Sequence, residues 1–95
     1  MRYIPPPPEN LQALKRELGK TGHEMAHLFG VAGGPQWRKY TGGNQPRDIS
    51  PQILFFGVAR LVLSPEELNK VLDRMRELGA EIDLDAPDNR ESEAA

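Results

Sequence analysis

Residues 21–47, TGHEMAHLFGVAGGPQWRKYTGGNQPR, carry the strongest structural signals of this chain. Thr21 and Glu24 form a capping box, in which each side chain satisfies a free amide in the first turn of a helix. Gly30 ends that helix. Pro35 follows two glycines and suits the first position of a new helix, because its missing N–H costs nothing there. The stretch therefore predicts two short helices joined by a glycine-rich turn, with a loop after the second helix.

The same kinds of signal predict three more helices outside this stretch. Leucines recur at helical spacing between residues 11 and 18, and a glycine at position 19 stops their helix. Ser50 followed by Pro51 opens a fourth helix, which is apolar over most of its circumference and is therefore expected to be central. Ser64 and Glu67 form a second capping box, which opens a fifth helix. The apolar stripe of the fifth helix comprises Leu68, Val71, Leu72, Met75 and Leu78.

Together these signals predict an all-α fold of five helices. We expect one domain over residues 1–84, with its core in residues 9–63 and a C-terminal helix at 64–79. Residues 81–84 alternate polar and apolar side chains, a pattern that is compatible with a short strand. Residues 85–95 are acidic and are expected to form a disordered tail. Pro5–Pro8 is a stiff polyproline stretch that leads into the first helix.

The amino-acid composition restricts the cellular compartment in which the protein is expected and excludes disulfides and thiolate metal sites. The chain contains no cysteine, so it can form neither a disulfide nor a thiolate metal site, which fits a reducing compartment. The longest apolar run, Ile53–Val58, is far shorter than the ~20 residues of a membrane span. The first ten residues, MRYIPPPPEN, lack the apolar segment of a signal peptide. We therefore expect a cytoplasmic protein that does not bind a membrane.

Charge is distributed unevenly along the chain. The formal net charge is −2. Residues 81–95 hold six of the 14 acidic residues and one of the 12 lysines and arginines, so residues 1–80 carry a net charge of +3. Between residues 30 and 47 there are three basic residues and no acidic one. A modest basic patch beside an acidic tail is compatible with the binding of phosphate groups.

The two short helices have the residue types of a helix-turn-helix, a DNA-binding motif. Its supporting helix needs a small residue that allows close contact with the second helix, and Ala26 fills that position. Its turn needs a residue that tolerates a positive φ, which Gly30 supplies, and an apolar residue that fills the turn, which is Val31. Its recognition helix needs two inward anchors three residues apart, here Trp37 and Tyr40. The outward positions of that helix are polar and long enough to reach base edges; they are Gln36, Arg38 and Lys39.

At these positions the chain resembles the lambda-repressor-like helix-turn-helix domains, the XRE family of bacterial and phage regulators. The resemblance covers roughly residues 11–63 and includes the five-helix order. It rests on Leu11-x-x-Leu14 with Arg16, Gly19-x-Thr21, Ala26-x-Leu28-x-Gly30-Val31, Trp37-x-x-Tyr40-x-x-Gly43 and Pro46-Arg47. It implies dimeric, sequence-specific operator binding, with the helix over residues 35–40 in the major groove.

The resemblance also implies roles for single residues. Gln36 and Lys39 match base-contacting positions, Thr21 and Gly22 match a helix start that holds a phosphate, and Asn44 lies in a loop that grips the DNA backbone. Two departures bear on these roles. The turn before the recognition helix is about one residue longer than is usual in the family. Gly22 replaces a polar residue, often glutamine, so one phosphate contact is lost or moved.

The chemistry of the side chains adds to these roles. Arg38 and Lys39 can pair with the O6 and N7 atoms of guanine, and Gln36 suits the N6 and N7 atoms of adenine. The remaining polar residues of the region are expected to contact phosphate and to fix the register without reading sequence; they are Thr41, Asn44 and Arg47.

Residues 23–27, HEMAH, also match H-E-x-x-H, the motif of zinc hydrolases. His23 and His27 have the i, i+4 spacing of two zinc ligands, and Glu24 would be the general base. The chain contains no third histidine, and Gly33 stands where the extended motif places its third ligand. The capping box with Thr21 accounts for a glutamate at position 24 without a metal site. We therefore expect no metal site and no enzymatic activity.

The sequence thus predicts a transcriptional regulator, a repressor that binds double-stranded DNA as a homodimer. The fifth helix is expected to contribute to the dimer. Neither a cofactor nor a small-molecule effector is expected. The alternative hypothesis is a protein-interaction adaptor that uses the helical scaffold without DNA, which the low total charge permits.

Overall fold

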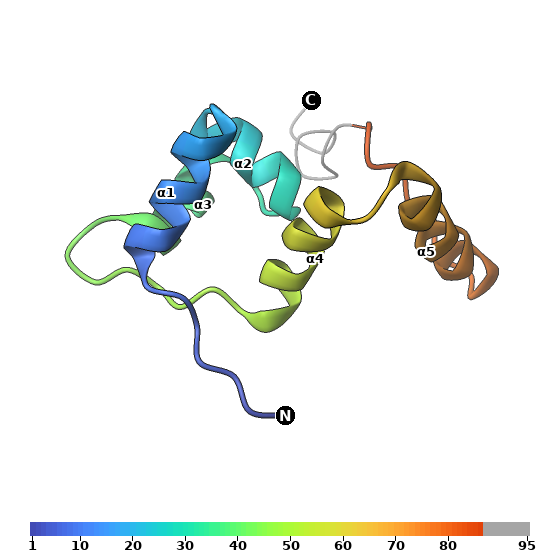
Figure 1. The fold of residues 1–95 in the computed structure, drawn as a ribbon, viewed down its shortest axis with the longest axis horizontal. Coiled ribbons are helices and arrows are strands. Elements are labelled where there is room, and N and C mark those ends of the chain that lie inside the picture. Colours follow the sequence, from blue (N-terminus) through green and yellow to red (C-terminus); the bar gives the residue numbers. More distant parts are fainter. Residues whose placement is uncertain (87–95) are drawn as a thin grey trace. The chain divides into compact units, whose positions relative to one another are not determined.

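A computed structural model describes residues 1–86, and this part of the chain consists of five helices without a strand (Figure 1). The all-α prediction is confirmed for these residues. Of the expected acidic tail, only Asp85 and Ala86 are described, and the rest lies outside the described residues. The helices are α1 (Pro8–Leu18), α2 (Gly22–Phe29), α3 (Gly34–Thr41), α4 (Pro51–Val62) and α5 (Pro65–Glu77).

The described part of the chain forms two compact units, Met1–Val58 and one that begins at Ala59, with the boundary inside α4. In the first unit α3 packs against both α1 and α2. None of the helices in residues 1–86 has the length and apolar character that a bilayer crossing requires.

The helix boundaries follow local hydrogen bonds that the sequence predicted. At α2 the Thr21 hydroxyl accepts from the Glu24 amide at 3.1 Å, and the Glu24 carboxylate accepts from the Thr21 amide at 2.9 Å. The same reciprocal pair joins Ser64 and Glu67 at the start of α5, at 3.1 and 3.0 Å. Gly30 ends α2 in the left-handed conformation with φ 70°. A serine or threonine at the N-cap stabilises its helix by about 1 kcal/mol.

The core of the first unit is built around Trp37. Its indole ring lies 5.0 Å from the ring of Phe29, centroid to centroid, at an angle of 42°. Met25 and Ile49 are likewise fully buried. The Tyr3 hydroxyl donates to the carbonyl of Ile49 at 2.6 Å, which ties the N-terminal segment to this core. Burial of each large apolar side chain stabilises the fold by about 1.5–3 kcal/mol.

The expectation that α4 is central is wrong. Gly57 is the one buried residue of this helix, and Phe55 is 77% exposed. Ile53 and Leu54 pack against the core, but they stay partly exposed. The helix approaches Phe29 through the backbone at Gly57. Its larger side chains are spread around the helix, so several of them point away from that contact.

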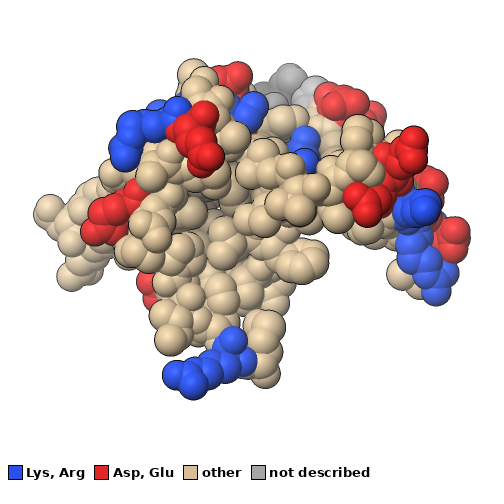
Figure 2. All heavy atoms as spheres, in the orientation of Figure 1, with Lys and Arg blue, Asp and Glu red and all other residues tan. Residues whose placement is uncertain are grey.

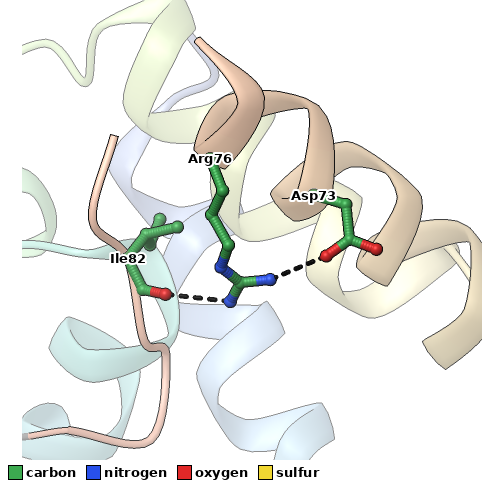
Figure 3. Close-up of polar contacts among 3 residues, drawn as sticks. All are labelled: Asp73, Arg76 and Ile82. Carbon is green, nitrogen blue, oxygen red and sulfur yellow. Dashed lines mark hydrogen bonds and ion pairs between the residues drawn. The ribbon is translucent and has the colours of Figure 1, made fainter. Parts of the chain in front are cut away.

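The short strand left open at residues 81–84 does not form, and these residues are irregular or in a turn. No neighbouring strand exists within residues 1–86 to supply the ladder bonds that an extended segment needs. Instead, the Arg76 side chain on α5 forms a hydrogen bond with this segment. Its Nη2 donates to the Ile82 carbonyl at 2.9 Å, while Nη1 pairs with Asp73 at 2.9 Å (Figure 3).

Candidate functional site

The contact between α2 and α3 has the features expected of a helix-turn-helix. Ala26 in the middle of α2 is completely buried. Val31 donates its amide to the Ala26 carbonyl at 2.9 Å, which closes the turn around the left-handed glycine at position 30. Trp37 and Tyr40 are buried at 1% and 6% exposure, so both predicted anchors of α3 point inward. Arg38 and Lys39, at other positions of α3, are exposed.

The loop after α3 is hydrogen-bonded to that helix. The Gly42 amide donates to the Arg38 carbonyl at 3.0 Å, and the Arg47 amide donates to the Lys39 carbonyl at 2.6 Å. From α1, the Gln12 side-chain amide donates to the carbonyl of Thr41. Gly43 has φ +83°, a backbone conformation that glycine adopts without strain. Residues 42–47 are therefore held as a fixed wall beside α3.

An open groove of about 500 Å³ lies between α3 and this loop. It is lined by Pro35, Arg38, Lys39, Thr41, Gly42, Gly43, Asn44, Gln45 and Arg47. Three of these residues are cations and none is a carboxylate. None of the three cations has a side-chain ion pair within the part of the chain that the structure describes. The groove therefore suits an anionic ligand.

The excess of positive charge in the groove is not typical of the rest of the surface. On the face drawn in Figure 2, acidic and basic side chains are intermixed, and over α5 they lie next to one another. Two ion pairs on that helix, Arg74 with Glu77 and Arg76 with Asp73, account for part of this pattern. The groove beside α3 differs because its cations have no such partners.

The structure brings five of the eight predicted DNA-binding residues into this one groove: Arg38, Lys39, Thr41, Asn44 and Arg47. Thr41 is nevertheless buried, at 8% exposure, so little of its side chain is open to a ligand. Sequence analysis missed Gln45, an exposed amide in the groove wall. Its place next to Asn44, in the glycine-rich loop after α3, was the available signal.

The other three predicted residues lie outside the groove lining. Gln36 is half-buried and donates its side-chain amide to the Tyr40 hydroxyl at 3.2 Å. The hydroxyl of Thr21 accepts a hydrogen bond from the Glu24 amide in the capping box. Gly22 lies beside the guanidinium of Arg38, whose Nη1 is 3.8 Å from the position of a Cβ on Gly22.

The H-E-x-x-H motif lies on α2, with His23 and His27 both exposed. Glu24 takes part in the capping box, and the hydrogen bonds from the Thr21 backbone and side chain lower the pKa of its carboxyl. A carboxylate with a lowered pKa is a weaker base. Among the residues that the structure describes, no three histidine, aspartate or glutamate side chains are grouped as metal ligands.

Comparison with protein-family models, with curated proteins and with solved structures finds no match to this chain. Any function must therefore be argued from the groove and from the α2–α3 contact.

Proposed function

We propose that this protein is a sequence-specific DNA-binding regulator of the lambda-repressor-like helix-turn-helix type. One observation carries the proposal: α2 packs against α3 with Ala26, Trp37 and Tyr40 buried, and a groove with three unpaired cations lies beside α3. In this proposal α3 enters the major groove of duplex DNA, and the loop over residues 42–47 lies along the sugar–phosphate backbone.

The side chains then divide by the part of DNA that they contact. Lys39 is exposed on α3 and reaches a base edge, where a good contact is worth about 1–3 kcal/mol of discrimination. Gln36 keeps its carbonyl oxygen and one amide hydrogen for a base, since Tyr40 takes the other amide hydrogen. Asn44 and Arg47 on the loop hold phosphate, which fixes register and carries no sequence information.

The proposal includes a homodimer that acts as a repressor. Val71 on α5 is 49% exposed, and Leu78, the residue that caps the end of this helix, is 74% exposed; the two are seven residues apart. The first turn of α5 carries Glu66 and Glu67, and its last turn carries Arg74 and Arg76, which also pair with Glu77 and Asp73 on the same helix. Two copies of α5 packed antiparallel would cover the apolar residues and would set each acidic end against a basic end.

A protein-interaction adaptor remains the second candidate, and one observation favours it. On α4, Phe55 is 77% exposed and Val58 is 40% exposed, three residues apart in the first unit, and an exposed apolar patch often marks a contact with another protein. An adaptor would have no use for the unpaired cations beside α3, whereas a DNA-binding protein would.

A salt titration separates the two candidates. The protein is mixed with a pool of random-sequence duplex DNA, and the dissociation constant is measured at several salt concentrations. A DNA-binding protein loses affinity with a slope of about −0.9 in log–log form for each phosphate that it neutralises. The absence of binding to any duplex at low salt would refute the proposed function and favour the adaptor.

A further inference from the structure

Two glycines face each other where α2 and α3 begin. A Cβ on Gly22 would lie 3.9 Å from the Cα of Gly34, and a Cβ on Gly34 would lie 3.7 Å from the carbonyl carbon of Gly22. Neither glycine has a positive φ, so the backbone itself does not require glycine at either position. A Cβ on Gly22 would make only ordinary contacts, but one on Gly34 would lie 3.2 Å from the Arg38 guanidinium. The glycine at position 34 therefore leaves space for that side chain.

The guanidinium of Arg38 lies beside that space. Its Nη1 is 3.2 Å from the position of a Cβ on Gly34 and 3.8 Å from that of a Cβ on Gly22. Arg38 follows Gly34 by one helical turn, so its side chain reaches back along α3 toward the start of α2. The residue has no ion-pair partner among residues 1–86. A cation thus stands at the helix start, free to bind an anion.

Other hydrogen-bond donors gather at the same place. The capping box takes up the amides of Thr21 and Glu24, whereas the amides of Gly22 and His23, in the first turn, have no acceptor within the helix. A third donor is the indole N–H of Trp37, which is buried and lacks an acceptor in the described part of the chain. The neighbouring ring atom Cδ1 lies 4.0 Å from the position of a Cβ on Gly22.

We propose that Arg38 holds a DNA phosphate at the start of α2 and reads no base. The inference rests on the proposed function and changes the role that the sequence suggested for Arg38. Gly22, at the start of α2, has no side chain of its own, and the guanidinium from α3 lies beside it and supplies the contact. Base reading is left to Lys39 and Gln36.

The salt dependence of DNA binding tests this role, with three variants compared with the unchanged protein. Arg38→Ala should lower the magnitude of the log–log salt slope by about 0.9, the loss of one neutralised phosphate. It should weaken all sequences by the same factor. Lys39→Ala should instead alter the preferred base at one position. Arg16→Ala, a cation on α1 outside the groove, is the matched control and should leave both properties unchanged.

Two results would have distinct meanings. If the unchanged protein binds duplex DNA, and Arg38→Ala keeps the full salt slope while it relaxes the preference at one base pair, Arg38 reads a base and the inference is overturned. If the unchanged protein binds no duplex at any salt concentration, the proposed function itself fails. Because the Arg38 guanidinium has no ion pair to lose, we expect the variant to fold, and circular dichroism checks this.

A rescue variant tests the location of the phosphate. Gly22 can accept a side chain, since the nearest atom to its Cβ position is 3.8 Å away. In the double variant Gly22→Gln/Arg38→Ala, the introduced side-chain amide donates a hydrogen bond to phosphate but carries no charge. The double variant should therefore regain affinity over Arg38→Ala while its salt slope stays reduced. No regain of affinity would place the phosphate elsewhere and overturn the inference.

Discussion

Replacement of Gly57 by alanine should destabilise the protein, although the same change stabilises most helices. Within a helix alanine is favoured over glycine by about 1 kcal/mol. At position 57, however, a Cβ would lie 2.2, 2.3 and 2.6 Å from Cδ2, Cε2 and Cγ of Phe29. The ring of Phe29 is 1% exposed and lies against Trp37, so it has no open space into which it could turn.

The size of the effect follows from these distances. Ordinary contacts of a Cβ begin at 3.4 Å, so the closest ring atom would have to move by about 1.2 Å. Overpacking of a tight core costs about 1–3 kcal/mol, and a conflict with three ring atoms belongs at the upper end. After subtraction of the gain in helix propensity, the free energy of unfolding should fall by about 2 kcal/mol. In a domain of this size such a loss lowers the Tm by about 8–16 °C.

Urea and thermal unfolding followed by circular dichroism measure this change. Gly42→Ala is the matched control. A Cβ at position 42 would lie 3.8 Å from the nearest atom, an ordinary contact, and the φ of −147° at this position suits any residue. Its stability should stay within about 0.5 kcal/mol of the unchanged protein. A Gly57→Ala variant as stable as the unchanged protein, or more stable, would refute the packing of α4 on Phe29.

Three further predictions concern the groove, the cap and the dimer. Lys39→Ala should relax base preference while Asn44→Ala weakens all sequences alike, as competition assays would show; equal effects of both would contradict the assigned roles. Hydrogen bonds from Thr21 lower the pKa of Glu24 below its ordinary value of 4.5. This carboxylate therefore stabilises the fold above its unfolded pKa and loses that contribution as the pH falls through the lower folded pKa. Glu24→Gln should flatten the pH dependence of the free energy of unfolding below the ordinary carboxyl pKa of 4.5, and an unchanged profile would count against the cap. Leu78→Lys should weaken dimerisation by about tenfold or more in sedimentation equilibrium, since it removes an apolar contact worth about 1.5–3 kcal/mol; an unaltered dimer would exclude α5 from the interface.

The helix starts and the turn were predictable because their causes are local. The bonds between Thr21 and Glu24 join residues three apart, and the left-handed glycine at position 30 needs no partner from elsewhere in the chain. The inward direction of Trp37 and Tyr40 followed from their spacing on one short helix. Such features depend on a few neighbouring residues, which the sequence displays directly.

Other features depend on contacts between distant residues. The apolar character of α4 predicted burial, but the contact of Gly57 with Phe29 decides which side faces the core. The direction of Arg38 depends on two glycines that meet only after α2 and α3 have packed. The alternation at residues 81–84 resembled a strand, yet a strand requires a partner that the described residues lack. The sequence pattern around each position contained no sign of these contacts.

Selection from a random-sequence duplex library is the decisive test of DNA recognition by α3. The proposed function predicts that repeated rounds with the full chain enrich one motif, and a dimer predicts two inverted half-sites whose centres lie about 10–10.5 base pairs apart or a multiple of that spacing. Binding to the enriched motif should then exceed binding to the starting pool by about a thousandfold or more. A library that remains random after selection, with no duplex bound at low salt, would contradict the proposal that α3 and its groove read DNA.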